Sequence, residues 1–169
     1  MGDSAGGGLC LLTIQALLEH KLPVPRGVVV LSPWADLSAS GESHIRNRHV
    51  DIVIQMNDDD NDWLLEQLLG PNYTQLSPNS SIYSPLFGSF ANFPPMYINV
   101  GTAEILEDDS RRILAKAREV GVDITFEQGQ HLMHCYPLLF LYCTEARNAL
   151  EKINQWIERI FERKKMSTN

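Results

Sequence analysis

The 169-residue sequence predicts an α/β fold in which parallel strands alternate with helices. Two short apolar runs, at 27–32 and 96–101, are typical of strands buried on both faces of a parallel sheet. A third run, at 122–127, alternates apolar and polar residues with the period of a strand. Segments with helical periodicity separate the three runs, and this alternation implies parallel βαβ units.

The first elements follow directly from the N-terminus. An apolar stretch follows the glycine cluster after Ser4, and nothing in residues 13–20 breaks a helix, so we expect a helix that ends before Pro23. The strand at 27–32 comes next, and Pro33 follows its last residue. The turn from Ser4 into the helix is rich in glycine, which permits close approach of neighbouring backbone.

The middle of the chain is predicted to be mostly loop. Residues 36–62 are polar and irregular, and residues 71–95 are rich in proline, serine and asparagine. Between them, the apolar positions of 63–69 fit one amphipathic helix that ends at Gly70. The strand at 96–101 follows the second loop.

The last third of the chain is predicted to add two helices and the third strand. Apolar residues at helical spacing indicate a helix over 110–120, before that strand. After the strand, the segment from about 138 to 163 is helical by pattern. We expect one domain over residues 1–165 and a disordered tail over residues 166–169.

Composition excludes several classes of protein. Fourteen basic against twenty-one acidic residues give a net charge of −7, whereas a nucleic-acid site needs a basic surface. No run of 18 apolar residues is present, so we expect no membrane-spanning helix. No secretory signal is recognisable at the N-terminus, and we therefore expect a cytoplasmic location.

The three cysteines are expected to be free thiols without a chemical role. An odd, sparse set of cysteines is typical of a reducing compartment. Cys10 and Cys143 lie on apolar helix faces and are expected in the core. Cys135 follows His134, but adjacent residues rarely present their side chains to each other. We therefore expect Cys135 to be a packing thiol.

One motif at the N-terminus suggests nucleophilic chemistry. The run Gly2-Asp3-Ser4-Ala5-Gly6 matches G-x-S-x-G, the nucleophile elbow in which a serine stands at a strained strand-to-helix turn. We expect glycine on both sides because side chains there would collide with backbone. The N–H of Ala5 and the helix dipole would stabilise an oxyanion. The pentapeptide alone fits a glycine- and serine-rich helix start equally well.

A serine nucleophile needs a base, and the base needs a carboxylate that orients it. Two histidines, His131 and His134, follow the third predicted strand. Two carboxylates, Glu104 and Asp108, follow the second. Because the carboxyl ends of parallel strands meet at one edge, we expect these side chains near one another. Spacing alone leaves both candidates open for each role.

Five segments together resemble the C-terminal part of the hormone-sensitive-lipase-type esterases, the α/β-hydrolase fold-3 group of carboxylesterases. The segments are residues 2–7, 31–37, 84–86 leading into 94–96, 100–110 and the stretch around His134. They occur in the family's order and cover nearly the whole chain. The resemblance implies a truncated α/β-hydrolase fold, with parallel strands flanked by helices and with the cap and the N-terminal strands missing.

The resemblance also assigns roles to individual residues. The family's nucleophile falls on Ser4, and its acid, which precedes a hydrophobic-Leu-x-Asp sequence, falls on Glu104, where many members have aspartate. Asp108 resembles the family's second acid at the helix start, where we expect a capping role. The family's histidine has an aromatic residue two positions on, which matches His134. His131 remains the alternative base.

The resemblance implies a serine carboxylic-ester hydrolase that acts on small-molecule esters through an acyl-enzyme, without a metal or cofactor. The family's His-Gly-Gly-Gly segment, which completes the oxyanion hole, has no counterpart in the sequence, so we expect impaired activity. The alternative is a non-catalytic half-domain that associates with another chain or with itself. The strand at 27–32 would then be an exposed edge that favours self-association.

Overall fold

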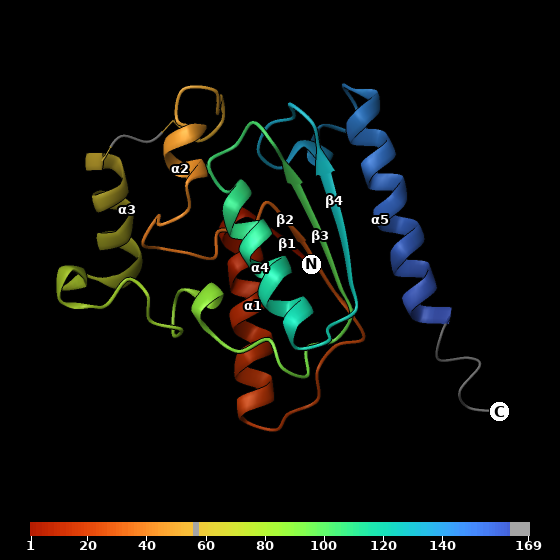
Figure 1. The fold of residues 1–169 in the computed structure, drawn as a ribbon, viewed down its shortest axis with the longest axis horizontal. Coiled ribbons are helices and arrows are strands. Elements are labelled where there is room, and N and C mark those ends of the chain that lie inside the picture. Colours follow the sequence, from red (N-terminus) through yellow and green to blue (C-terminus); the bar gives the residue numbers. More distant parts are fainter. Residues whose placement is uncertain (56–57, 163–169) are drawn as a thin grey trace.

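A computed structural model describes residues 1–55 and 58–162, and Figure 1 shows their arrangement. Four strands form one sheet in the order β1-β2-β3-β4, and every neighbouring pair is parallel. The strands are β1 (Gly2–Asp3), β2 (Val28–Leu31), β3 (Met96–Gly101) and β4 (Ile124–Gly129). The predicted α/β class is therefore confirmed. The predicted tail at 166–169 lies outside the described residues.

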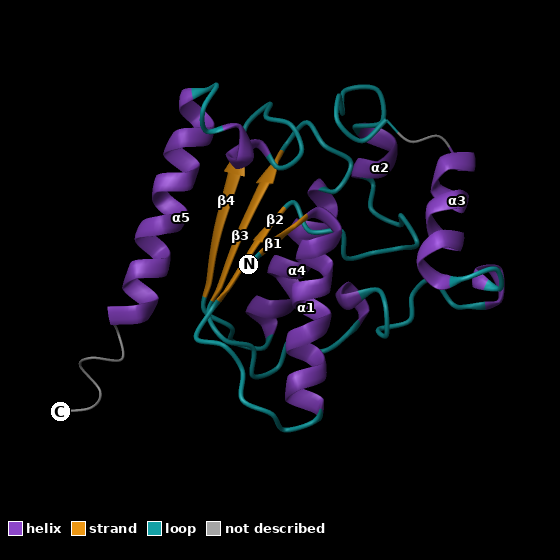
Figure 2. Cartoon of the chain, turned by 180° about the vertical axis from the view of Figure 1, so that it is seen from behind, coloured by secondary structure: helices purple, strands orange, loops and turns teal. Residues whose placement is uncertain are grey.

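Helices cover both faces of this sheet. Helices α1 (Ser4–Glu19) and α4 (Glu107–Glu119) lie on one face, and α5 (Thr144–Glu162) lies on the other (Figure 1). Helices α2 (Ser43–Arg46) and α3 (Asp58–Leu69) stand to one side of the sheet, joined to it by loops (Figure 2). Among the helices of the described ranges, none has the length and apolar character needed to cross a membrane.

The core is divided into two layers by the alternation of side chains along the strands. Val28 and Val30 of β2 pack into one cluster, and Val29 and Leu31 pack into another on the opposite face. The helical residues of the first cluster are Leu11, Ile14, Ile113 and Ala117, and those of the second are Ile153, Trp156 and Ile160. Burial on both faces explains why β2 is apolar at every position.

The last helix begins later than its pattern predicts. The helix expected from about residue 138 starts at Thr144 and follows a 3₁₀ turn at Tyr136–Leu139. Leu141 and Tyr142, which extend the apolar pattern, are exposed in the connection between turn and helix. Cys135, just before the 3₁₀ turn, has a left-handed backbone conformation. Two further 3₁₀ turns interrupt the loop predicted at 71–95.

The expectation that the 27–32 strand forms an exposed edge is wrong in part. β1 has only two residues, yet it pairs with the second half of β2, Gly2 opposite Val30 and Asp3 opposite Leu31. In the described sheet β2 is therefore an inner strand, and β1 and β4 stand at the two ends. The two residues of β1 are enough for this pairing with β2, because a parallel bridge needs only a short extended segment.

Candidate active site

Four polar residues follow the four strands at the carboxyl edge of the sheet. Ser4 comes directly after β1 and Ser32 directly after β2. Glu104 lies in the loop after β3, and His134 lies in the loop after β4. Because all the strands are parallel, these four positions share one edge, where ligand sites of open α/β sheets form.

The backbone around Ser4 has the geometry of a sharp strand-to-helix turn. Ser4 has a φ of +52°, a left-handed conformation that costs energy for a residue with a side chain. A Cβ on Gly2 would lie 2.3 Å from the carbonyl oxygen of Gly6, so only glycine fits there. A Cβ on Gly6 would meet nothing within 4 Å. The expected need for glycine on both sides of the serine thus holds for Gly2 and is wrong for Gly6.

The first turn of α1 presents backbone N–H groups that the helix does not use. Ala5 is the second residue of this helix, and the first four N–H groups of any α-helix have no acceptor within it. Asp3 stands at the N-cap but makes no capping hydrogen bond with its side chain. The partial positive charge of this helix end therefore remains available to a negatively charged oxygen.

Glu104 and His134 form a buried pair. The Oε2 atom of Glu104 lies 2.6 Å from Nδ1 of His134. Glu104 is fully buried and His134 is 9% exposed. The second carboxylate oxygen, Oε1, accepts a hydrogen bond from the backbone N–H of Gly101 at 3.0 Å. Both carboxylate oxygens are thus engaged, which fixes the direction of the side chain toward the imidazole.

Cys135 faces His134, contrary to the expectation of a thiol that only packs. Its Sγ lies 3.3 Å from Nε2 of His134. The cause is the left-handed backbone of Cys135, with φ at +53°, because an extended or right-handed residue would point its side chain away from its neighbour. The N–H of Cys135 donates to Oγ of Ser32 at 3.0 Å, which anchors this conformation to the end of β2.

The charge on the His134 imidazole is set by opposing effects. Burial lowers the pKa of His134, but hydrogen bonds to Cys135 and Glu104 and the negative charge of Glu104 raise it to about 10. Among the described residues no side chain hydrogen bonds to the Ser4 hydroxyl. The structure thus joins two of the three predicted catalytic residues directly and places Ser4 at the same edge of the sheet.

The two alternative candidates have other contacts. His131 is exposed, and its backbone N–H donates to Oγ1 of Thr102 at 2.7 Å. The Oδ2 atom of Asp108 accepts a hydrogen bond from the backbone N–H of Ser43 at 2.7 Å. The expected capping role of Asp108 is wrong, because α4 has Leu106 at its N-cap without a side-chain cap. Asp108 lies inside the first turn and points to a different segment of the chain.

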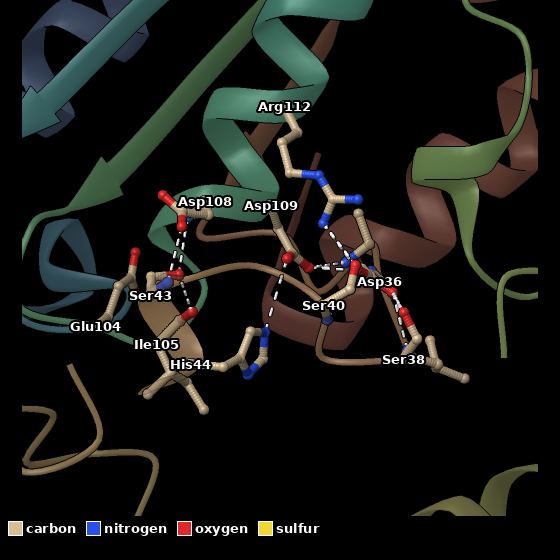
Figure 3. Close-up of polar contacts among 12 residues, drawn as sticks. Asp36, Ser38, Ser40, Ser43, His44, Glu104, Ile105, Asp108, Asp109 and Arg112 are labelled. Atoms are coloured by element: carbon tan, nitrogen blue, oxygen red, sulfur yellow. Dashed lines mark hydrogen bonds and ion pairs between the residues drawn. The ribbon is translucent and has the colours of Figure 1, made fainter. Parts of the chain in front are cut away.

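A second group of acidic residues organises the loop after β2 (Figure 3). The Oδ2 atom of Asp109 accepts hydrogen bonds from the backbone N–H groups of Ala35 and Asp36, at 2.9 and 3.0 Å. Asp36 in turn pairs with Arg112 at 2.8 Å. Burial raises the pKa of Asp109. Burial also acts to raise the pKa of Asp36, but hydrogen bonds from Ser38, Ser40 and Arg112 outweigh it and lower that pKa.

Several polar residues near the site were not identified from the sequence. Ser32, Asn47 and Asp51 are buried and hydrogen bond to the loops that carry His134 and Glu104. Asn47 and Asp51 lie in the segment predicted to be polar and irregular, where such residues usually face solvent. Their spacing of four residues is compatible with one helical face, but nothing in the sequence marks that face as buried.

Comparisons with known proteins agree with this architecture. A family model described as alpha/beta hydrolase fold matches residues 1–138. An acetyl-hydrolase of Streptomyces hygroscopicus is 33% identical over 150 residues, which are 89% of this chain and 48% of that protein. An esterase of Acinetobacter venetianus is 28% identical over 156 residues, 92% of this chain and 50% of that protein. The chain spans about half the length of the curated relatives it matches.

Solved structures give the same result. The crystal structure of an esterase from the bacterial hormone-sensitive lipase family superposes with a TM-score of 0.84 and 31% identity. The match covers 94% of this chain and 51% of that one. A hormone-sensitive lipase from a metagenome library also reaches a TM-score of 0.84, at 28% identity, over 94% of this chain and 52% of that one. The similarity therefore extends over nearly all of this chain and about half of each of those structures.

Proposed function

The chain belongs to the α/β-hydrolase fold family, among its hormone-sensitive-lipase-type esterases, and on that premise we propose that it is a serine carboxylic-ester hydrolase. Ser4 is the nucleophile, His134 the general base and Glu104 the residue that orients the base. The observation that carries the proposal is the buried 2.6 Å contact between Glu104 and His134, at the edge where Ser4 ends β1.

In the first half of the proposed reaction, Ser4 Oγ attacks the carbonyl carbon of the ester and His134 Nε2 takes the hydroxyl proton. Glu104 accepts the Nδ1 proton in a hydrogen bond and stabilises the imidazolium that forms. The bond between the carbonyl carbon and the alcohol oxygen then breaks. His134 returns its proton to that oxygen, so the alcohol leaves neutral and the acyl group remains on Ser4.

In the second half, water attacks the acyl carbon while His134 takes one of its protons. The bond to Ser4 Oγ breaks, the proton returns to that oxygen, and the carboxylic acid leaves. The negative charge on the carbonyl oxygen in both tetrahedral intermediates would face the N–H of Ala5 in the first turn of α1. One such donor contributes about 10²–10³ in rate in a comparable enzyme.

The proposed substrates are small-molecule esters. The support for this class comes from the relatives, one of which is named acetyl-hydrolase and another esterase. The three proposed residues of this chain act on the ester group itself, which is common to all such substrates. The isolated chain is expected to turn over slowly, because the family's His-Gly-Gly-Gly segment has no counterpart in its sequence.

The proposal is tested by hydrolysis of p-nitrophenyl acetate and by labelling with a fluorophosphonate, which reacts with an activated serine. The wild-type chain is expected to release p-nitrophenol and to carry the phosphonate on Ser4, located by peptide mass spectrometry. Ser4→Ala is expected to lower kcat/KM to the level of the buffer, since loss of a triad nucleophile costs about 10⁴–10⁶-fold. Ser81→Ala, at an exposed serine in a turn, is the matched control.

Two results would contradict the proposal. Turnover that survives in Ser4→Ala would assign the nucleophile to another residue. A folded wild-type chain that shows neither turnover nor labelling would favour the alternative, a non-catalytic half-domain. Concentration-dependent dimerisation in size-exclusion chromatography would support that alternative.

A further inference from the structure

Three buried polar residues lie on one side of the segment that contains α2. Ser43, Asn47 and Asp51 are 0%, 5% and 2% exposed. The N–H of Asn47 bonds to the carbonyl of Ser43 at 2.9 Å, and that of Asp51 bonds to the carbonyl of Asn47 at 2.8 Å. These contacts keep helical spacing beyond the four residues of α2, so the three side chains share one face. We call them the polar row.

The polar row inverts the usual pattern of an amphipathic segment. Ile45 and Val50, which lie between its members, are 83% and 53% exposed. A buried polar group is costly unless it is hydrogen-bonded, so the burial of polar residues beside exposed apolar ones needs a specific partner. That partner is the loop after β3, which carries Glu104.

Two members of the polar row bind a single peptide unit of that loop. The Nδ2 group of Asn47 donates to the carbonyl oxygen of Glu104 at 2.7 Å and to that of Thr102 at 3.2 Å. The Oδ2 atom of Asp51 accepts from the N–H of Ile105 at 2.9 Å. The carbonyl of Glu104 and the N–H of Ile105 belong to the same planar peptide. Rotation of this peptide would therefore break both hydrogen bonds together.

The third member secures the next residues of the loop (Figure 3). The hydroxyl of Ser43 donates to the carbonyl oxygen of Ile105 at 2.5 Å and accepts from the N–H of Asp108 at 3.0 Å. The N–H of Ser43 donates to the Asp108 carboxylate. The loop between β3 and α4 is irregular around Glu104, so few backbone hydrogen bonds of its own fix its conformation.

We propose that Asn47 and Asp51 are positioning residues for the catalytic acid, because they fix the peptide that follows Glu104 and thereby the direction of its side chain toward His134. This inference rests on the proposed function, which makes Glu104 the acid. The orientation of the peptide sets the ψ angle of Glu104, and that angle helps to determine where its carboxylate lies. Neither Asn47 nor Asp51 hydrogen bonds to His134, so their effect on the imidazole passes through the peptide that follows Glu104.

The direct test uses Asn47→Leu, which keeps the approximate volume and the charge but removes both donors. Histidine side-chain NMR then follows the Nδ1 proton and the titration of His134. The charged and titratable groups that face His134 are Glu104 and Cys135, and both remain in the variant. If the carboxylate moves away, the Nδ1 proton resonance shifts upfield and the pKa of His134 falls by about 1–3 pH units.

Asn154→Leu, at an exposed position of α5, is the matched control and should leave the His134 signals unchanged. Asn47→Ser, which is smaller and also too short to reach the loop, provides a second variant if leucine prevents folding. Both variants are compared with wild type under conditions where circular dichroism shows a folded chain. The NMR signals require no ester turnover, so the result is independent of whether Ser4 proves to be the nucleophile.

A change in the His134 signals of the Asn47 variants, with no change in the control, would support the proposal. The opposite result is also clear. If the variants lose thermal stability while the folded chain keeps the wild-type Nδ1 resonance and the wild-type pKa of His134, the polar row only stabilises the loop. The proposal would then be wrong, although the proposed hydrolase function would stand.

Discussion

Replacing Glu104 with glutamine removes the negative charge beside His134 and preserves the shape of the side chain. Glu104 is fully buried, and its Oε2 lies 2.6 Å from Nδ1 of His134. A glutamine oxygen can still accept the hydrogen bond from the N–H of Gly101, but its NH₂ group then faces Nδ1 of His134. The buried imidazolium therefore loses both its counter-charge and its hydrogen-bond acceptor.

The magnitude follows from the pKa of His134. A pKa of about 10 in the folded chain, against about 6.5 in the unfolded chain, corresponds to roughly 5 kcal/mol of stabilisation, which the hydrogen bond to Cys135 and the interaction with Glu104 supply together. Removal of one partner from a buried ion pair costs about 3–5 kcal/mol in other proteins. Because the pKa is raised by folding, this stabilisation is fully present below about pH 6.5 and is lost as the pH rises through about 10.

Urea unfolding of wild type and Glu104→Gln at several pH values between about 6 and 10 measures this effect. The free-energy gap between the two proteins is expected to be largest near pH 6 and to shrink by about 3–5 kcal/mol toward pH 10. Glu104→Asp, which keeps the charge, should retain the pH dependence. Glu158→Gln, at an exposed position of α5, should show neither effect. A gap that stays constant over this range would refute the reasoning.

Four further outcomes are expected. Ile153→Ala, which empties a buried position of α5, should lower the free energy of unfolding by about 2–5 kcal/mol in urea titrations. Gly8→Ala should lower the Tm, because its Cβ would lie 2.1 Å from the carbonyl oxygen of Trp34. Gly6→Ala, whose Cβ would meet nothing within 4 Å, should instead stabilise the fold by about 0.4–1 kcal/mol. Equal effects of the two substitutions on the Tm would contradict this. The rate of ester hydrolysis should rise with pH toward about 10, because only a neutral His134 accepts a proton, and a flat profile would count against its role as base. Cys135→Ala should lower the pKa of His134 in an NMR titration, because it removes a hydrogen bond that raises this pKa.

The strands were predictable because burial on both faces leaves a signal in the sequence itself. Residues 28–31 and 96–101 are buried at every position, which favours the largely apolar runs that identified them, although Asn99 is a buried polar residue in the second run. β1 could not be predicted in this way, since a two-residue strand has no periodicity and exists through its pairing with β2. The start of α5 was missed because Leu141 and Tyr142 extend its apolar pattern although both are exposed.

Residues of the candidate site could be predicted only where a sequence motif or a position after a strand specifies the residue type. The spacing around Ser4 and the positions of Glu104 and His134 after successive strands could be read directly from the sequence. The contact of Cys135 with His134 could not be predicted from the sequence, because it depends on a left-handed backbone angle that cysteine does not favour. Asn47 was missed because a polar residue in a loop gives no sign of burial until the loop that covers it is known.

The left-handed residues at the carboxyl edge of the sheet have a consequence for protein engineering. Ser4, Ser32, His131 and Cys135 all have φ angles between +46° and +58°. Glycine adopts these angles without steric cost, whereas other residues are strained by about 1–3 kcal/mol. A library screened for heat resistance alone would therefore enrich glycine at Ser4 and discard its hydroxyl, whereas the hydroxyl of Ser32 accepts a buried hydrogen bond from Cys135 that glycine would lose. Stabilising libraries for this protein should hold the four positions fixed and vary the helices that cover the sheet.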